Sequence, residues 1–228
     1  MLPLPEILFR DARFVVLNKP AGLAVHPGPR GGRSVEDFFP LLSRRRDGPW
    51  LAHRLDADTA GCLLIALRKA ALVAAQAEFA AGRVGKTYWA VVHGGPAAEA
   101  GTVEAPLRRV SGPVGWRMRI DSGGQRAVTD WRILGRGAGL AWLELAPRTG
   151  RTHQVRAHCA ALGCPILGDP VYGPHARSGQ LHLLARALHL ALDPPVVATA
   201  EPPGHMRAAL ADCGYRSGAA VRASNLET

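Results

Sequence analysis

Lysine is scarce in this chain, which has only Lys19, Lys69 and Lys86 among its 28 basic residues. The acidic residues number 18, so a formal net charge of +10 remains, and arginine carries most of it. A soluble domain this basic often binds nucleic acid or another polyanion. A compositional bias toward arginine explains the same charge equally well, so charge alone leaves both interpretations open.

Long apolar runs are also lacking. No stretch approaches the roughly 20 residues that a membrane-spanning helix needs. The N-terminal segment has no basic part followed by an apolar core, as a signal peptide would have. We therefore expect a cytoplasmic protein that does not associate with membranes. With 228 residues, 47% of them hydrophobic, the chain suits one large domain or two small ones and is too apolar for wholesale disorder.

Metal and nucleotide signatures are missing as well. The four cysteines form no Cys-x-x-Cys pair and no zinc-finger spacing, so we expect reduced, mostly buried thiols. Neither the GxGxxG loop nor the GxxxxGK[ST] loop, which bind phosphates, occurs in the sequence. The sequence therefore does not indicate a nucleotide cofactor. His153 and His158 would lie about 140° apart around a helix, which disfavours a zinc ion shared between them.

Short runs rich in β-branched and aromatic residues dominate the predicted secondary structure. The predicted strands are residues 6–10, 14–18, 62–67, 87–93, several runs within 101–145, and 181–192. The predicted helices are residues 70–81, 152–162 and 206–213, and Thr152 is the predicted N-cap of the second one. Strands outnumber helices and do not alternate with them regularly. We therefore expect an α+β fold with a mixed, largely antiparallel sheet and flanking helices and loops.

A charged segment, HRLDADTAG (residues 53–61), leads directly into the predicted buried strand at 62–67. Basic residues just before Asp56 can hold its carboxylate ionised. Such a carboxylate at the mouth of a strand can act as a nucleophile or a base. A structural salt bridge with a turn at Asp58 and Thr59 explains the same residues, and physics alone favours it.

A second cluster, RTGRTHQVRAH (residues 148–158), places basic and imidazole side chains at the start of a predicted helix. A helix N-terminus favours anions, and arginine adds bidentate phosphate contacts. Without an anionic partner these cations would repel one another, so a purely structural role fits less well. Tyr88, on a predicted strand, either fills the core or offers a ring face to a base. The loop PILGDPVYG (165–173), with Asp169, is interpreted as structural.

Together these segments resemble the RluA-type pseudouridine synthases. HRLDADTAG, KTYWAVV, TGRTHQVRAH and GCPILGDPVYG occur in the order and approximate spacing of that family. FVVLNKPAGLAVHPG and TAEPPGHM are similar to the family's opening and closing segments. The resemblance covers roughly residues 6–213 and implies the pseudouridine-synthase fold, with a catalytic domain over residues 1–216. The composition of the last residues, 217–228, predicts a polar, flexible tail.

The resemblance also implies a reaction: isomerisation of uridines in tRNA or rRNA, with no cofactor and no metal. Uridine is detached from its ribose at N1 and rejoined through C5, which requires the base to be flipped into a pocket. Asp56 is the implied catalytic group, either attacking the ribose or assisting its deprotonation. Arg156 is expected to pair with Asp56 and keep it charged. Asp58 is not expected to be catalytic.

Further site residues follow from the same resemblance. Arg54 is expected to contact RNA near the extruded nucleotide, and Tyr88 to pack on the target uracil. His53 and Arg151 are expected among the RNA-binding residues. The separate roles of Arg151, Thr152, His153 and Gln154 stay open.

Two departures from the family pattern are visible. Ala60 stands where serine is usual, which predicts a lost hydroxyl hydrogen bond and retained activity. Glu201 stands where a small residue is expected.

The implied catalytic domain begins near residue 6, leaving no room for the S4-type RNA-binding domain of many relatives. Substrate choice would then depend on the catalytic domain and its loops at 28–33 and 44–46, or on RNA shape.

An alternative function is a catalytically silent RNA-binding or RNA-chaperone protein of the same fold. The intact set of Asp56, Tyr88 and Arg156 favours the enzyme. A metal-dependent nuclease would need an acidic cluster, which the sequence does not show. We expect RNA as the partner, no obligatory protein partner and a monomer.

Overall fold

The computed structural model describes residues 3–28, 31–112, 115–174 and 179–216, so the predicted tail at 217–228 lies outside the described residues. The strands of the main sheet are β1 (Ile7–Arg10), β2 (Phe14–Lys19), β3 (Trp50–Leu51), β4 (Ala60–Ala66), β5 (Gly85–His93), β6 (Ala100–Glu104), β9 (Val128–Gly137), β10 (Leu140–Pro147), β11 (Leu183–Leu190) and β12 (Val196–Thr199). A separate hairpin consists of β7 (Leu107–Gly112) and β8 (Gly115–Ile120). The helices are the 3-10 turn η1 (Val35–Phe38), α1 (Phe39–Leu42), α2 (Lys69–Ala80), α3 (Gln154–Ala161) and α4 (Gly204–Asp212).

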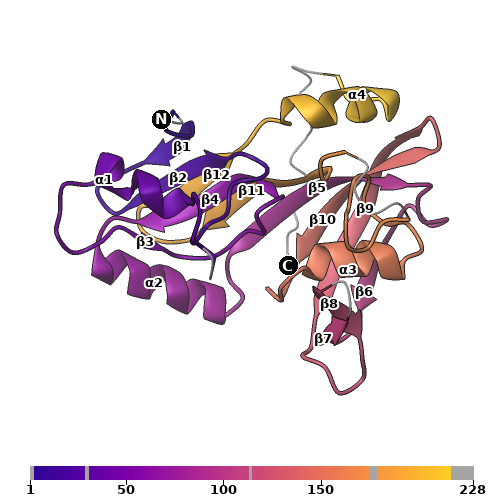
Figure 1. Cartoon of the computed structure of the whole chain (residues 1–228), viewed down its shortest axis with the longest axis horizontal. Helices are drawn as coiled ribbons and strands as arrows, with labels where there is room; N and C mark the ends of the chain where they lie inside the picture. Colours follow the sequence, from indigo (N-terminus) through magenta and orange to yellow (C-terminus); the bar gives the residue numbers. More distant parts are fainter. Residues whose placement is uncertain (1–2, 29–30, 113–114, 175–178, 217–228) are drawn as a thin grey trace.

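One long sheet runs through both halves of the molecule (Figure 1). Its strand order is β1-β2-β4-β11-β5-β10-β9-β6, with β12 beside β11 and β3 beside β4. Among the described strand pairs, β4 and β11 are parallel and the others are antiparallel. The predicted mixed, largely antiparallel α+β fold is confirmed. The strands predicted at 6–10 and 14–18 form the expected hairpin, β1–β2.

The parallel contact between β4 and β11 depends on Gly61. Gly61 pairs with Ala185 and has a φ of +107°, a conformation that side chains rarely adopt. A Cβ atom at this position would collide with the carbonyl oxygen of Ala185. Glycine therefore lets the two strands approach, and this fixes where the HRLDADTAG segment enters the sheet.

Strand β4 is the centre of the N-terminal half. All seven of its residues are buried, as the apolar run at 62–67 predicts for a strand covered on both faces. Helix α2, predicted over 70–81, covers this half, and its Ala71 and Ala75 pack in the same core cluster as Leu64. This packing holds rigid the strand that follows Asp56.

Helix α3 confirms the prediction of a helix within 152–162, but the predicted cap at Thr152 is wrong. The N-cap is His153, which has a φ of +51° and makes no capping hydrogen bond with its side chain. The left-handed backbone at His153 delays the first helical turn by one residue. Val155, Cys159 and Leu162 pack into one core cluster, as their spacing predicts.

All four cysteines have free thiols and are buried, as expected. Burial raises the pKa of Cys62 to about 12 and that of Cys164 to about 11, which keeps these thiols protonated at neutral pH. In the part of the chain that the structure describes, no helix is long and apolar enough to cross a membrane.

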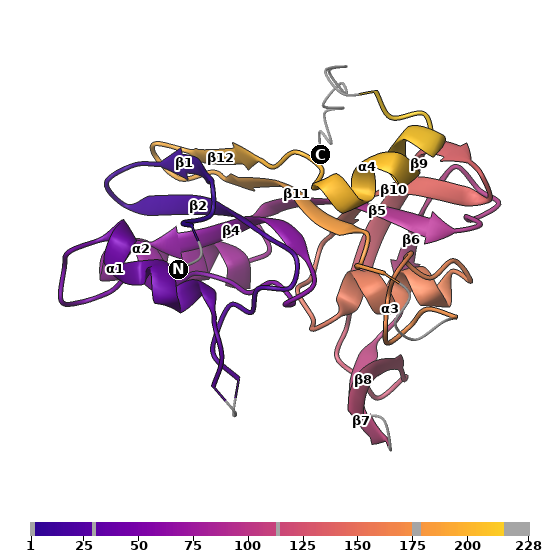
Figure 2. The same ribbon diagram turned by 45° about the horizontal axis from the view of Figure 1, so that its top comes forward.

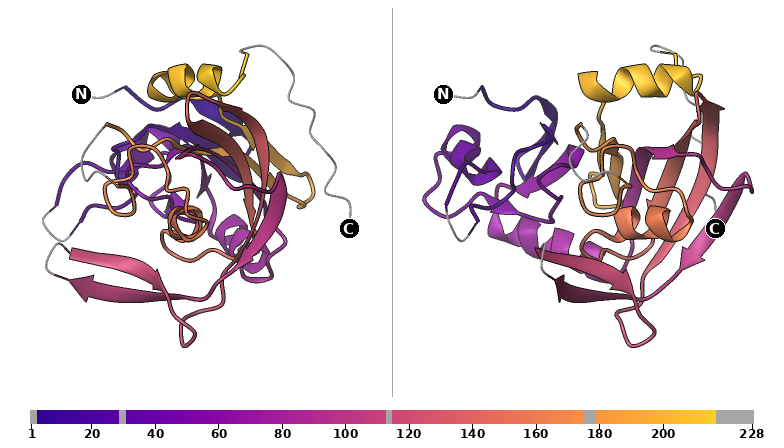
Figure 3. Two further views of the ribbon diagram at one scale, coloured as in Figure 1. Left: turned by 90° about the vertical axis from the view of Figure 1, so that its right-hand side faces the viewer. Right: turned by 45° about the vertical axis from the view of Figure 1, so that its right-hand side comes forward.

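Strands β5 and β11 pass between the half that carries α1 and α2 and the half that carries α3 and α4 (Figures 1 and 2). The β7–β8 hairpin extends away from the main sheet, on the side opposite α4 (Figures 2 and 3). The loop before β4 and the start of α3 meet where the two halves join.

Candidate active site

A cavity of about 910 Å³ lies where the two halves join. Its wall combines the loop before β4, strand β5 and the start of α3, which are far apart in the sequence. The sequence-predicted residues in this wall are His53, Arg54, Asp56, Tyr88, Arg151 and Arg156. The fold thus brings together all the predicted site residues around one space.

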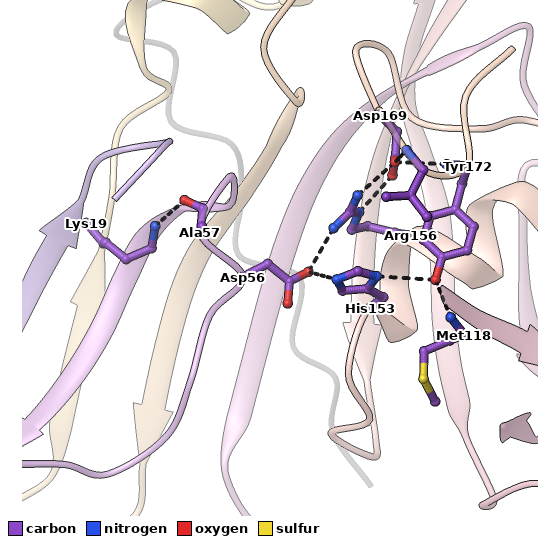
Figure 4. A network of polar contacts seen from close by, with 9 residues as sticks. Lys19, Asp56, Ala57, Met118, His153, Arg156, Asp169 and Tyr172 are labelled. Carbon is purple, nitrogen blue, oxygen red and sulfur yellow. Dashed lines mark hydrogen bonds and ion pairs between the residues drawn. The ribbon is translucent and has the colours of Figure 1, made fainter. Parts of the chain in front are cut away.

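Asp56 occupies a turn, in which its carbonyl oxygen accepts the N–H of Thr59 at 3.1 Å. Its side chain is 25% exposed. Arg156 Nη1 donates to Oδ2 at 3.3 Å, and His153 Nε2 lies 3.8 Å from the same oxygen (Figure 4). Among the described residues, the polar contacts of this carboxylate all go to Oδ2. This arrangement leaves Oδ1 available to a bound molecule.

The main partner of Arg156 is Asp169. Arg156 Nε and Nη2 donate to the two carboxylate oxygens of Asp169, both at 2.8 Å. Burial raises the pKa of Asp169, but the hydrogen bonds and charge of Arg156 and the N–H groups of Val171 and Tyr172 hold that pKa below its usual value. The predicted contact of Arg156 with Asp56 is present, yet it is the longer one. Sequence reasoning identified Asp169 only as a residue of a structural loop.

His153 connects Asp56 to a tyrosine. Its Nδ1 lies 3.3 Å from the hydroxyl oxygen of Tyr172, and that oxygen accepts the N–H of Met118 at 2.9 Å. Burial raises the pKa of Tyr172, which keeps its hydroxyl protonated at neutral pH. Burial lowers the pKa of His153, although the charge of Asp56 opposes this. The sequence left the role of His153 open, and the structure places it between Asp56 and the β7–β8 hairpin (Figure 4).

Lys19 is a site residue that sequence reasoning missed. It is fully buried, and its Nζ donates to the carbonyl oxygens of Ala57, Leu23 and Pro20 at 2.7, 2.8 and 3.0 Å. Burial lowers the pKa of Lys19 to about 8, against the opposing charges of Asp58 and Asp56. The last residue of β2 thus fixes the backbone next to Asp56. The available signal was a lysine directly after an apolar strand in a chain with few lysines.

His53 lines the cavity, but its ring is engaged in the scaffold. Its Nε2 accepts the N–H of Leu64 at 3.0 Å, and the ring stacks on Phe79 with centroids 5.0 Å apart. Burial, with a smaller contribution from the charge of Lys86, lowers the pKa of His53 to about 4. The ring is therefore neutral at pH 7 and better placed to support β4 than to bind a phosphate.

Two exposed arginines line the cavity, Arg54 before β4 and Arg151 before α3. Arg151 Nε donates to the carbonyl oxygen of Arg126 at 3.1 Å. Arg148, by contrast, is paired with Asp130 at 2.6 Å. Within the described ranges, Arg54 and Arg151 have no carboxylate partner, which leaves their charge for an anion.

Tyr88 lies on β5 in the cavity wall and is half-buried. Burial raises the pKa of its hydroxyl, with a smaller contribution from the charge of Asp56. A neutral ring partly open to the cavity can stack on a base.

Two other polar residues of α3, Gln154 in its first turn and His158 in its last, make contacts within the fold. Gln154 accepts the Thr149 hydroxyl at 2.7 Å and the Arg151 N–H at 3.0 Å, and it donates to the Val128 carbonyl at 3.0 Å. The ring of His158 is buried within hydrogen-bond distance of Thr129 and Ala105. In the described ranges, no three His, Cys, Asp or Glu side chains are grouped to hold a metal ion.

The unusual Glu201 has a structural explanation. Arg186 Nη1 donates to Glu201 Oε1 at 2.9 Å, and the Arg186 guanidinium lies 4.4 Å from the ring centre of Trp89. The hydroxyl of Tyr215 donates to the other Glu201 oxygen at 3.2 Å. Glu201 therefore fixes Arg186 outside the cavity. The other departure, Ala60, is buried in β4.

Comparison with known proteins agrees with the geometry. Residues 13–161 match the family model described as RNA pseudouridylate synthase. An uncharacterised RNA pseudouridine synthase of Zymomonas mobilis is 39% identical over 215 residues, which cover 92% of this chain and 97% of that protein. The ribosomal large subunit pseudouridine synthase D of the same organism is 38% identical over 201 residues, which cover 82% of this chain and 63% of that protein.

A solved structure gives the same result. The human RNA pseudouridylate synthase domain-containing protein 4 has a TM-score of 0.78 to this chain at 29% identity, over 91% of this chain and 92% of that one. Some other relatives are longer: a Synechocystis protein described as an uncharacterised RNA pseudouridine synthase is 36% identical, and the matched part is 59% of its length.

Proposed function

The chain belongs to the RluA-type RNA pseudouridylate synthase family, whose reaction is the isomerisation of uridine to pseudouridine in RNA, and we propose that Asp56 is its catalytic group. One observation carries this proposal. The carboxylate of Asp56 is held through Oδ2 by Arg156, while Oδ1 has no protein partner among the described residues. A charged, oriented and accessible oxygen in a cavity is what a nucleophile or base requires.

The chemistry uses this oxygen in one of two ways. Asp56 either attacks the ribose carbon and displaces uracil from it, or assists deprotonation of the ribose. In the first route the new bond between Oδ1 and the ribose carbon breaks again when C5 attacks that carbon, and in the second the proton taken from the ribose returns to it. In both routes the net change is the same: the bond to N1 breaks and the bond to C5 forms, while C5 loses a proton and N1 gains one. The isomerisation therefore consumes no second substrate, and the residues have only to hold the free uracil and exclude water.

The cavity wall carries the residue types that would bind a flipped nucleotide. The base must leave its stack to expose the glycosidic bond, and it then needs a ring partner in the pocket. Tyr88 supplies that partner from β5, by a contact typically worth roughly 1–3 kcal/mol per base. Arg54 and Arg151 supply positive charge for the neighbouring phosphates. His53 contributes mainly by fixing the strand that follows Asp56.

The substrate is a tRNA or an rRNA, and the enzyme acts in the cytoplasm as a monomer without an obligatory protein partner. Residues 1–216 form its catalytic domain, and residues 217–228 are a polar tail. The net charge of +10 supports an RNA substrate.

The test is a map of pseudouridine in total RNA from a strain that lacks the gene. We expect at least one uridine to lose its modification, and the wild-type gene to restore it while Asp56→Ala does not. Restoration by Asp56→Ala would refute the role of Asp56. An unchanged map, together with RNA binding by the pure protein, would favour the alternative, a silent RNA-binding protein.

A further inference from the structure

We propose that His153 is a positioning residue for Asp56 and that the β7–β8 hairpin holds His153 in place. RNA that binds to the hairpin would then change how the Asp56 carboxylate is held. The proposal rests on the proposed function of Asp56. It gives a role to a hairpin that lies outside the main sheet and to a histidine whose role the sequence left open.

His153 presents one definite nitrogen to Asp56. The Tyr172 oxygen already accepts the Met118 N–H, so the hydroxyl hydrogen of Tyr172 can be donated to Nδ1 of His153. We therefore assign the proton of the neutral ring to Nε2, the nitrogen 3.8 Å from Asp56 Oδ2. A small closing movement would turn this distance into a second hydrogen bond to Oδ2, beside that of Arg156. Both donors then restrain one oxygen and leave Oδ1 for the ribose.

The inner face of the hairpin supports the ring of His153. Trp116 stacks on it with ring centroids 4.7 Å apart and an interplanar angle of 27°. On the same strand, Met118 is the backbone donor to Tyr172 (Figure 4). Arg109 lies 4.5 Å from the ring centre of Trp116. Thus Trp116 holds the ring of His153, and Met118 holds the hydroxyl of Tyr172, which faces the other nitrogen of that ring. Both residues lie on the same face of β8.

The outer face of the hairpin is strongly basic. The register pairs Arg108 with Arg119 and Val110 with Arg117, so these side chains share the face opposite to Trp116 and Met118. The three arginines are exposed, and Arg108 has a carboxylate neighbour, Asp121, at 3.4 Å. Like charges directly opposite each other destabilise a strand pair. Their placement suits the phosphates of an RNA strand lying along the hairpin.

The hairpin lies outside the main sheet. Its two strands form a sheet of their own, and it stands away from the body in three views (Figures 1, 2 and 3). Its base packs through Leu107 and Met118 against Ala127 and Ala157. Because Trp116 and Met118 contact His153 and Tyr172, a shift of the hairpin toward bound RNA shifts the ring that faces Asp56.

The first test separates kcat from KM with a transcript that spans the uridine mapped in the deletion strain. We expect Trp116→Ala to lower kcat by about tenfold or more and to leave KM within about threefold. Trp116→Phe keeps a stacking ring and should retain most of kcat. Thermal unfolding of both variants checks that the fold is intact, since Trp116 is 38% exposed.

A second test uses His153 itself. His153→Gln keeps a side-chain N–H donor, whereas His153→Ala does not. Both variants place a residue with a Cβ atom at the left-handed position, so backbone strain is matched between them. We expect a higher kcat for His153→Gln than for His153→Ala. The double variant Trp116→Ala/His153→Ala should be no slower than His153→Ala, because the two residues act in series.

The outer face is tested by Arg117→Gln/Arg119→Gln. We expect a higher KM and a weaker dependence of RNA binding on salt, with kcat retained at saturating RNA. The matched control is Arg207→Gln/Arg216→Gln, which removes the same charge from exposed positions in and after α4 and should leave KM unchanged.

Several results would overturn the proposal. They are a wild-type kcat in Trp116→Ala and His153→Ala, multiplicative effects in the double variant, or equal KM changes in the hairpin and control pairs. Loss of activity in Asp56→Asn together with any of these would reject the coupling and keep the proposed function. Full activity in Asp56→Asn would reject the proposed function itself.

Discussion

Arg156 and Asp169 form a buried, bidentate ion pair with both N–O distances at 2.8 Å. The side chain of Asp169 is 0% exposed and that of Arg156 is 3% exposed. The pair fixes the plane of the guanidinium, and this plane directs the Nη1 donor to Asp56. The anchor of the Asp56 carboxylate, through Arg156, is therefore a second carboxylate that does not line the cavity.

Asp169→Asn tests this anchor. The change leaves the charge of Arg156 buried without its main partner, which should lower the free energy of unfolding by about 3–5 kcal/mol. Urea unfolding measures this loss, and kcat should fall as well because Arg156 is no longer oriented. The matched control is Glu201→Gln, which weakens an arginine pair whose carboxylate is 66% exposed. We expect less than about 1 kcal/mol there. Equal losses in the two variants would contradict the account.

The neutral ring of His53 makes stability depend on pH. Its pKa falls from 6.5 to about 4 on folding, so between these values the unfolded chain binds more protons than the folded one. Stability from this group is complete above the unfolded pKa and is lost as pH falls toward 4, by up to about 3 kcal/mol. The measurement is urea unfolding at pH 7 and pH 4.5 for wild type and His53→Gln. The difference between the two proteins should shrink at the lower pH, and a constant difference would show that His53 titrates normally.

Much of the fold could be predicted from local patterns. The apolar run at 62–67 predicts a buried strand, and β4 confirms this prediction. The cap of α3 could not be predicted, because the left-handed backbone of His153 depends on contacts with residues distant in sequence. Thr152 is a residue type that is common at N-caps, but it lies one residue before the N-cap of α3.

The site was predictable by residue type and only partly by role. The motifs named Asp56, Tyr88 and Arg156 correctly as neighbours of one cavity. Lys19 was missed because a lysine before a Pro-Gly loop is normally solvated, and only the fold shows three carbonyl oxygens around it. Asp169 was missed because its partner, Arg156, lies on a helix and the loop between them gives no sign of which residues will pair.

Lys19→Met tests the second support of Asp56. The substitution keeps the length of the side chain and removes three hydrogen bonds to carbonyl oxygens, including that of Ala57. Each buried acceptor left without a donor costs about 1–3 kcal/mol, although Gly22 still donates to Ala57. We expect a lower midpoint in urea and a lower kcat in the folded variant. A stability equal to that of wild type would rule out the supporting role.

Tyr88 can be tested by a pair of substitutions. Tyr88→Phe keeps the ring that faces the cavity, and Tyr88→Ala removes it. If the ring stacks on the target base, the alanine variant should lose about 1–3 kcal/mol of transition-state binding. The values of kcat/KM for the two variants report the difference. An alanine variant as active as the phenylalanine variant would show that no base stacks on Tyr88.

The most direct measurement for the central claim is single-turnover formation of pseudouridine by Asp56→Asn on the mapped transcript. Asparagine keeps the size of the side chain and removes the charge, while the exposed Arg54 and Arg151 in the cavity wall are unchanged. The account predicts RNA binding within about threefold of wild type and no detectable product, a loss of at least about 10³-fold in rate. Product formation at the wild-type rate would contradict the role of Asp56.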